Sequence, residues 1–294
     1  PQDGAISAKL EDRTVDLRVS TVPTVWGEKV VMRILDKGAI PLELASLGFD
    51  PKQVDTLRKA LTHPYGLFFV TGPTGSGKST TLAAMISEIN SQLKGHIVTI
   101  EDPIEFVHER KRCLISQREV GEHTRDFSEA LHSALREDPD VILVGEMRDL
   151  ETISIAVTAA EMGILVMGTL HTNGAGQTVD RIVNVFPTDK QPHVRTMLST
   201  SLRGVISQQL VPRKDGGLVA ALEILVNNPA TANLIRQGKL DQLETAMQAG
   251  RKSGMMTMDT ALSSLFDNGV ISGRSVYEFA NDKEKFKEYR LLDD

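Results

Sequence analysis

Gly72-Pro73-Thr74-Gly75-Ser76-Gly77-Lys78-Ser79 decides the fold of this 294-residue chain. The stretch matches the pattern G-x-x-x-x-G-K-S/T at every fixed position, after an apolar run expected to be a buried strand and before an expected helix. In that setting the glycines let the backbone wrap a phosphate, and the helix N-terminus favours its negative charge. The sequence therefore predicts a nucleoside triphosphate site. The alternative is a glycine-rich turn that happens to precede a helix.

Individual residues of this loop have separate expected roles. Lys78 is expected to reach the β- and γ-phosphates, and the hydroxyl of Ser79 is expected to bind Mg²⁺. No Asn-Lys pair occurs in the chain, so the Asn-Lys-x-Asp signature of guanine-specific GTPases is missing and ATP is the expected nucleotide. The loop residues expected to hold it are Gly72, Thr74, Gly75, Ser76, Gly77, Lys78 and Ser79.

Around the loop, apolar strands alternate with stretches of helical spacing. The expected strands are 66–71, 96–100, 140–144, 164–167 and 218–226, and the expected helices are 51–62, 78–93, 126–137 and 149–162. Strands separated by helices of this length predict a parallel sheet covered on both faces. The fold class is therefore α/β, with a RecA-like P-loop ATPase core over 51–226 and a helical C-terminal region over 227–294.

The first residues predict a small β region. Val15, Leu17 and Val19 alternate with polar residues, as in a half-buried strand, and 29–35 is a second candidate. We expect 1–37 to be the C-terminal part of a small β-rich domain, followed by a linker over 38–50. Because so few strands make no core alone and the chain does not begin with methionine, part of that domain is expected to be missing upstream.

Composition excludes several classes of protein. Thirty-three basic and thirty-nine acidic side chains give a net charge of −6, which disfavours a dedicated nucleic-acid binder. The single cysteine, Cys113, allows neither an intramolecular disulfide nor a thiolate zinc site, and no two of the seven histidines have the H-x(3–5)-H spacing, so no zinc is expected. The sequence has no membrane-spanning run and no signal-peptide pattern, which predicts a soluble protein of a reducing compartment.

Polar groups follow three of the expected strands. They are Glu101-Asp102-Pro103-Ile104-Glu105, Val144-Gly145-Glu146 and Leu170-His171-Thr172-Asn173. Because the carboxyl ends of parallel strands meet at one edge, we expect the acids of the first stretch to face Mg²⁺ or its waters and Glu146 to polarise the attacking water. The alternatives are a solvated turn for the acidic run, a helix-start carboxylate for Glu146 and an ordinary loop residue for His171.

Four stretches resemble the sequence boxes of the type II/type IV secretion ATPases, the group of PilT, PilB and GspE. They are Gly72–Thr80 (Walker A), Thr99–Phe106 (Asp box), Asp138–Asp149 (Walker B) and Gly168–Asn173 (His box). Residues 16–23 and 27–33 are similar to the end of that family's N-terminal domain. The resemblance implies a homohexameric motor that binds ATP between its two domains and moves pilus or pseudopilus subunits through an inner-membrane platform protein. It also implies a cytoplasmic location, membrane association only through partners, and no bound nucleic acid.

The resemblance assigns roles to residues at matching positions. It implies catalytic roles for Glu146, Glu105, His171, Arg18 and Arg33, and nucleotide contacts for Thr80, Glu101, Asp102 and Arg136. His132 stands where relatives commonly carry arginine, which leaves Arg136 alone there. The chain lacks the tetracysteine module of the secretion and assembly branches. Residues 206–213 and 220–224 resemble the retraction branch, whereas 230–236 match its signature only partly, so assembly and retraction both stay open.

Other P-loop proteins are alternatives. A RecA-like nucleic-acid translocase should show basic pore loops, but the only basic cluster is the short Arg110-Lys111-Arg112. A P-loop kinase needs an arginine-rich lid, and none is evident. A non-catalytic ATP-binding assembly factor should lack Lys78 or Glu146, and both are present.

Overall fold

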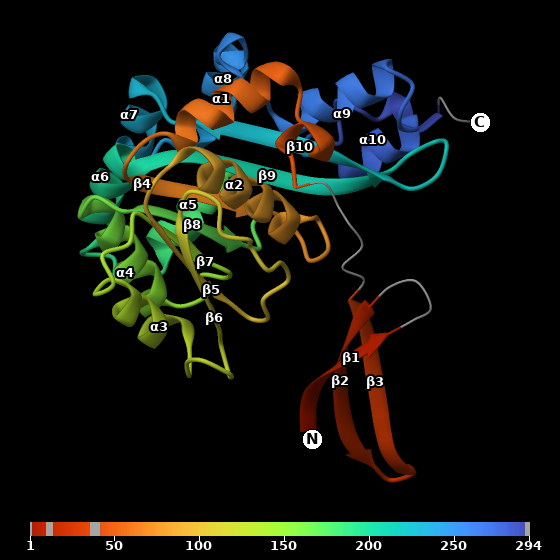
Figure 1. Cartoon of the computed structure of the whole chain (residues 1–294). Coiled ribbons are helices and arrows are strands. Elements are labelled where there is room, and N and C mark those ends of the chain that lie inside the picture. The colour runs from red at the N-terminus through yellow and green to blue at the C-terminus, as the bar shows by residue number, and fades with distance from the viewer. Residues whose placement is uncertain (1, 10–13, 36–41, 292–294) are drawn as a thin grey trace. The chain divides into compact units, whose positions relative to one another are not determined.

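The structure is a computed structural model that describes residues 2–9, 14–35 and 42–291. The chain divides into two compact units, Pro1–Pro41 and Leu42–Asp294 (Figure 1). Within the described ranges, no helix is both long and apolar enough to cross a membrane.

The smaller unit contains an antiparallel sheet with the strand order β1-β2-β3. Its strands are β1 (Gln2–Lys9), β2 (Thr14–Thr24) and β3 (Gly27–Leu35). The two expected strands are confirmed, and β1 is added to them. The turn between β2 and β3 is closed by the hydroxyl of Thr24, which donates to the carbonyl of Gly27 at 2.6 Å.

The larger unit is built on a seven-stranded sheet with the order β10-β9-β4-β8-β7-β5-β6. The strands are β4 (Gly66–Thr71), β5 (His96–Glu101), β6 (Leu114–Glu119), β7 (Val141–Val144), β8 (Leu165–Leu170), β9 (Leu202–Pro212) and β10 (Leu218–Val226). The expected parallel arrangement is confirmed for β4 to β9. The expected strand 218–226 is confirmed as β10, and it runs antiparallel to β9 because the short connection between them permits only a hairpin.

Two strands of the larger unit lie outside the predicted set. β6 carries the polar run Ser116-Gln117-Arg118-Glu119, and β9 is interrupted by Gly204 and by Ser207-Gln208-Gln209, so neither shows a clear apolar pattern.

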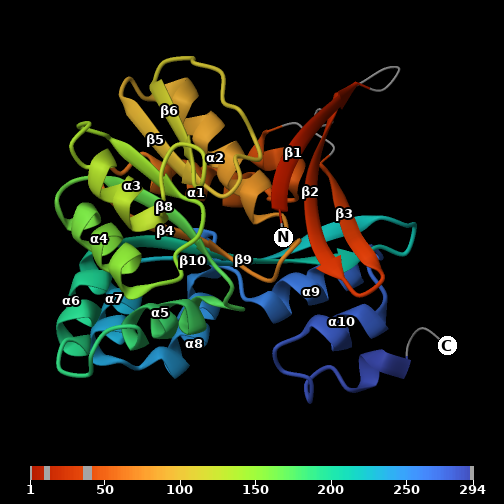
Figure 2. The ribbon, with the colours of Figure 1, turned by 90° about the horizontal axis from the view of Figure 1, so that it is seen from below.

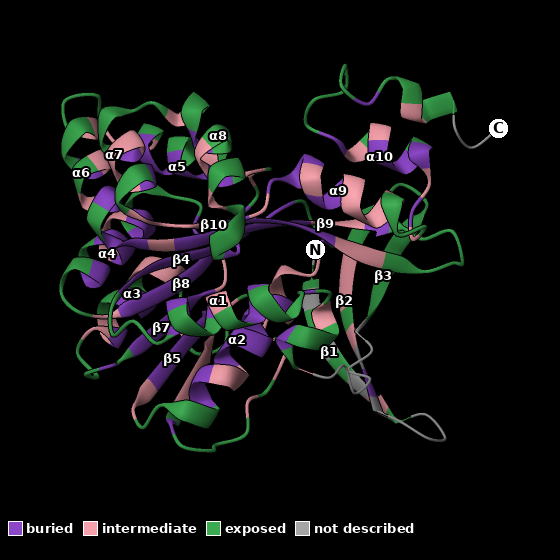
Figure 3. Ribbon diagram, turned by 90° about the horizontal axis from the view of Figure 1, so that it is seen from above, coloured by how far each residue is buried: buried purple, intermediate pink, exposed green. Residues whose placement is uncertain are grey.

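Helices cover both faces of this sheet (Figures 2 and 3). One face carries α1 (Pro51–Leu61) and α2 (Lys78–Gln92), which pack on Phe68 and Val70 of β4. Leu67 and Phe69 face the other layer, which comprises α3 (Phe127–Ala134), α4 (Leu150–Glu161), α5 (Ala175–Asn184), α6 (Gln191–Ser201), α7 (Pro229–Gln237) and α8 (Leu243–Ala249). A third cluster packs α9 (Met258–Asp267) and α10 (Gly273–Phe279) on Val211 and Ala221 of β9 and β10. The expected short C-terminal helices are confirmed.

The expected linker over 38–50 falls partly outside the described residues. From Leu42 onward it belongs to the larger unit, where Leu44 and Phe49 are buried against α1 and α2. Asp50 then starts α1 with a capping box, because its carboxylate accepts from the backbone N–H of Gln53 while the Gln53 side chain accepts from the N–H of Asp50.

Candidate active site

Four neighbouring parallel strands carry the motifs at their carboxyl ends. The strands β4, β8, β7 and β5 lie side by side in the sheet. The glycine-rich loop follows β4, His171 follows β8, Glu146 stands two residues beyond β7, and Glu101 is the last residue of β5. The expected meeting of these strand ends is confirmed by the strand order, and it matches the usual location of ligand sites in parallel sheets.

The glycine-rich loop closes tightly on the neighbouring strand β9. Gly72 has a φ of 138°, and a Cβ at this position would lie 2.2 Å from the carbonyl oxygen of Gln208. No residue with a side chain fits there, so glycine is required for the loop to turn into α2. The ammonium of Lys78 donates to the carbonyls of Gly72 and Pro73, each at 2.9 Å. The hydroxyls of Thr71 and Ser76 are buried without a hydrogen-bond partner, and they flank the turn.

The side chain of Gln208 on β9 supports the glycine-rich loop through hydrogen bonds that were not predicted from the sequence. Its side chain is 2 % exposed. The amide nitrogen donates to the carbonyl of Ser76, while the amide oxygen accepts from the hydroxyl of Thr81 at 2.9 Å. The stretch 206–213 was recognisable as a family feature, but nothing local in it indicates that β9 pairs with β4.

Glu146 and His171 form the polar centre of the edge. His171 Nε2 lies 3.1 Å from Glu146 Oε1, and the guanidinium of Arg148 donates to Glu146 Oε2. Burial favours the neutral acid, but Arg148, His171 and Lys78 outweigh it and hold the pKa of Glu146 below its ordinary value. Glu146 is therefore an ionised carboxylate at neutral pH. Arg148 is a second residue that was missed, although it stands in the same sequence box.

Lys78 lies within electrostatic reach of two acids. Burial lowers the pKa of its ammonium, whereas the charges of Glu146 and Glu105 raise it. Three of the expected site residues are thus gathered around one point, the mouth of the glycine-rich loop. This arrangement can hold a phosphate chain on one side and a water molecule near Glu146 on the other.

A small cavity of 30 Å³ lies beside the start of α2. Its lining includes Ser79, Glu101, Gly145 and Thr169. Glu101 Oε1 accepts from the hydroxyl of Thr99 at 2.7 Å and from the amide of Gln117 at 3.3 Å, while burial raises the pKa of this carboxyl. Hydroxyl and carboxylate oxygens are ligands that suit Mg²⁺, which keeps several waters and takes few protein ligands. The donor set therefore fits a magnesium ion that arrives with nucleotide.

Gly145 lies tightly against the neighbouring strand β5. A Cβ at this position would lie 3.2 Å from both the Cα of Glu101 and the carbonyl oxygen of Ile100. The backbone of β5 would have to shift by a few tenths of an ångström to accept a side chain here. A carboxylate on this side of the site comes from Glu101.

Asp102 and Glu105 lie at the same edge, in the loop after β5. Asp102 is close enough to Arg148 to raise the pKa of its guanidinium, although Glu146 contributes more. The amide of Gln117 donates to the carbonyl of Phe106 at 2.9 Å, which fastens the loop to β6.

One expected residue of the larger unit does not join this cluster. Arg136 is exposed between α3 and the start of β7, at the opposite edge of the sheet from the glycine-rich loop. Arg18 and Arg33 belong to the smaller unit, where both are exposed. His132 Nε2 lies 4.0 Å from Glu151 Oε1.

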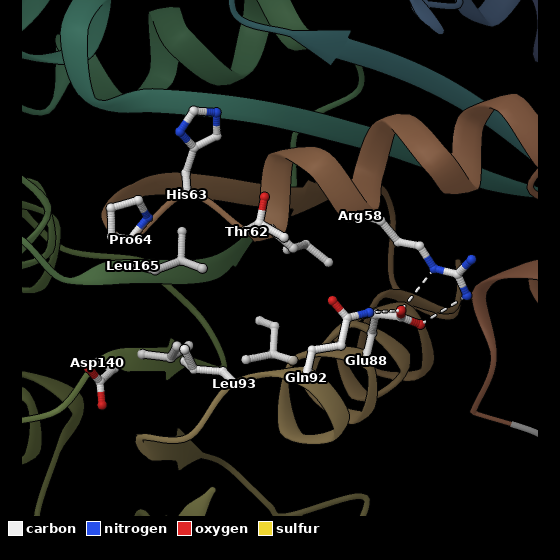
Figure 4. Close-up of a pocket in the computed structure, with 12 residues that line it drawn as sticks. Arg58, Thr62, His63, Pro64, Glu88, Gln92, Leu93, Asp140 and Leu165 are labelled. Atoms are coloured by element: carbon white, nitrogen blue, oxygen red, sulfur yellow. Dashed lines mark hydrogen bonds and ion pairs between the residues drawn. The ribbon is translucent and has the colours of Figure 1, made fainter. Parts of the chain in front are cut away.

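A larger cavity of about 340 Å³ opens at the amino ends of the strands (Figure 4). Its walls are mostly apolar, and Arg58 of α1 pairs with Glu88 of α2 across its rim at 2.8 Å. None of the expected site residues lines it. The expected site residues of the larger unit that lie together are thus found at the carboxyl edge, away from this cavity.

Comparisons with known proteins find relatives over nearly the whole chain. Residues 1–268 match the family model described as "Type II/IV secretion system protein". The chain is 53 % identical over 269 residues to the type IV pilus retraction ATPase PilT of Pseudomonas aeruginosa, covering 92 % of this chain and 76 % of that protein. It is 53 % identical over 268 residues to a twitching motility protein of Neisseria gonorrhoeae, covering 91 % of this chain and 70 % of the relative. A crystal structure of the pilus retraction motor PilT with bound ADP superposes with a TM-score of 0.86 at 44 % identity, covering 97 % of this chain and 80 % of that one.

Proposed function

The chain belongs to the type II/IV secretion system protein family, and from this premise we propose that it drives type IV pilus retraction by hydrolysing ATP at the edge described above. That it is a pilus or secretion motor ATPase follows from its relatives. Retraction, rather than secretion, is supported by the 53 % identity to a retraction ATPase, compared with 48 % identity to a type II secretion ATPase of Vibrio cholerae.

A single observation carries the site assignment, namely the grouping of Lys78, Glu146 and His171 around the mouth of the glycine-rich loop. In the proposed mechanism, the backbone of 72–79 and Lys78 hold the phosphates in line. Glu146 is ionised and orients the attacking water, and His171 fixes the position of that carboxylate. Glu105 adds negative charge near Lys78, which together with Glu146 offsets part of the lowering of its pKa by burial.

We propose that Ser79 and Glu101 hold a magnesium ion together with the nucleotide, Glu101 through a water molecule. When bound, Mg²⁺ neutralises charge on the β- and γ-phosphates. The proposed nucleotide-contacting residues remain those of the loop, Gly72 to Thr80, with Glu101 and Asp102 at the metal side. Arg136 is left out of this pocket because it lies at the opposite sheet edge.

We further propose that the active form is a homohexamer and that Arg18 and Arg33 act on the phosphates of a neighbouring copy. The support is the exposed arginine pair, whose two like charges lie opposite one another and would favour a bound anion. An arginine placed against the developing phosphate charge accelerates P-loop enzymes by about 10³–10⁵. The proposed partner is an inner-membrane platform protein, which would hold a cytoplasmic motor at the membrane.

Two measurements test the proposed function. The purified chain should hydrolyse ATP in the presence of Mg²⁺, and Lys78→Ala should abolish turnover. Added DNA should leave the rate unchanged, whereas strong stimulation by DNA would support a nucleic-acid translocase instead. For the direction of the stroke, deletion of the gene in its host should increase the number of surface pili if the motor retracts them and decrease it if the motor assembles them.

A further inference from the structure

Two consecutive residues of β9 reach functional loops on opposite faces of the sheet. Gln208 points with Ile206 toward α2 and holds the glycine-rich loop. Ser207 points the other way, and its hydroxyl accepts from the backbone N–H of Gly174 at 2.9 Å. Gly174 ends the short loop that carries His171 and precedes α5. One strand therefore touches both halves of the active site.

Glu223 lies directly opposite Ser207 in the antiparallel pair of β9 and β10. It is 6 % exposed, and Oε1 accepts from the backbone N–H of Ala175 at 2.7 Å. The side chains of Ser207 and Glu223 thus accept hydrogen bonds from two successive backbone N–H groups at the start of α5, those of Gly174 and Ala175. The segment after His171 is anchored at both points.

The second oxygen of Glu223 serves another part of the chain. Glu223 Oε2 accepts from the backbone N–H of Met258 at 3.1 Å, at the start of the C-terminal helix α9. Both α5 and α9 lie on the same side of the β9–β10 pair (Figure 2). Burial raises the pKa of this carboxyl, as do the charges of Glu244 and Asp259, while the two N–H bonds lower it. Burial of a carboxyl group is energetically unfavourable unless hydrogen bonds compensate for the lost water, and here the N–H groups of Ala175 and Met258 do so.

We infer that Glu223, with Ser207 beside it, is a positioning residue for ATP hydrolysis, which fixes the His171 loop and ties it to the C-terminal helix α9. The chain of contacts runs from Met258 through Glu223 to Ala175, then through the loop to His171 and Glu146. The position of the C-terminal helices is thereby coupled to the orientation of the catalytic carboxylate. This inference rests on the proposed roles of Glu146 and His171.

The test is a double-mutant cycle between Glu223 and His171. In Glu223→Gln the amide keeps one acceptor oxygen, so one of the two N–H groups loses its partner. We expect kcat to fall about ten- to a hundredfold with the KM for ATP nearly unchanged, because the loop is misplaced rather than the nucleotide released. In a His171→Ala background the same change should cost less than about twofold, since the residue being positioned is already gone.

Asn90, near the end of α2, provides a matched control. It is also buried, 1 % exposed, and its Oδ1 accepts from two backbone N–H groups, those of Lys111 and Cys113, each at 3.2 Å. Asn90→Ala should lower the melting temperature and leave kcat unchanged. Full additivity of Glu223→Gln with His171→Ala, or an equal loss of kcat in Asn90→Ala, would show that Glu223 is merely structural.

A second variant, Ser207→Ala, and a hydrogen-exchange measurement test the same inference. Ser207→Ala removes only the acceptor for Gly174, so it decides the question if Glu223→Gln does not fold, and it should also be non-additive with His171→Ala. Amide hydrogen exchange over 171–178 should be faster in both variants and unchanged in Asn90→Ala. Unchanged exchange over 171–178 in Glu223→Gln and Ser207→Ala would overturn the inference. Full activity of His171→Ala would refute the role proposed for His171, and the exchange measurement would still test whether Glu223 and Ser207 anchor the loop.

Discussion

Arg18 of β2 and Arg33 of β3 lie directly opposite one another in the antiparallel sheet of the smaller unit. Residues opposite one another across two strands point to the same face, so the two guanidinium groups share one exposed surface. Like charges in this arrangement are destabilising, by about 0.2–1 kcal/mol. A bound anion would remove that cost, and a nucleotide phosphate is the anion that the proposed function supplies.

The first prediction concerns this pair. Arg18→Ala and Lys78→Ala should each be inactive alone, but mixing them under conditions where subunits exchange should restore part of the ATPase rate. Some interfaces of a mixed ring then combine an intact Lys78 with an intact Arg18. Mixtures that stay inactive although mixed rings form would exclude action of Arg18 in trans. Arg125→Ala, at an exposed arginine outside the site, should remain active by itself.

The second prediction concerns the support of the glycine-rich loop. Gln208→Ala removes both side-chain hydrogen bonds to Ser76 and Thr81, each worth about 0.5–1.5 kcal/mol. The dissociation constant for ATP should therefore rise about tenfold, as measured by titration with a fluorescent nucleotide. Gln209, the next residue, lies on the opposite face of β9, and Gln209→Ala should bind like the unmodified protein. Equal affinity in both variants would refute the supporting role.

The third prediction is that replacing Gly145 by alanine destabilises the protein. Gly145→Ala pushes a Cβ against the backbone of Glu101 and Ile100, so the free energy of unfolding should fall by about 1–3 kcal/mol. Gly176→Ala in α5 is the control, because its Cβ would make an ordinary contact at 3.5 Å. That variant should be as stable as the parent or slightly more so. Denaturant melts that show no loss for Gly145→Ala would contradict the packing argument.

The fourth prediction concerns pH. Glu146 acts as an ionised carboxylate with a lowered pKa, so turnover is retained on acidification until the pH falls through that pKa. Arg148→Gln removes a positive charge that stabilises the carboxylate, so the pKa should rise and the acid limb of the kcat profile should move to higher pH. Arg148→Lys keeps the charge and should shift the limb much less. A profile that is identical in all three proteins would remove Glu146 from the acid limb.

Local patterns were sufficient for much of the fold and for the site's framework. The glycine-rich loop, the strand ends at Glu101, Glu146 and His171, and the helix starts at Asp126 and Asp149 are all encoded within short windows. Their meeting at one edge follows from the rule for parallel strands alone. The catalytic and binding roles assigned to these residues stay predictions.

The features that were missed depend on non-local pairing. The polar residues of β6 and β9 interrupt the apolar pattern by which a strand is predicted. Three of these residues form hydrogen bonds to the loops of the site: Gln117 on β6, and Ser207 and Gln208 on β9. Arg148 could not be assigned because its contact with Glu146 depends on the loop after β7. The antiparallel turn into β10 likewise depends on how β9 is placed.

The most direct test of the central claim is the ATP turnover of Glu146→Gln. This variant keeps the shape of the side chain and removes the charge that orients water, while Lys78 and the loop stay intact. We expect ATP affinity within about threefold of the parent and a kcat reduced by at least about a hundredfold. Near-normal turnover in Glu146→Gln would contradict the account, because the hydrolytic water would then be oriented by another group.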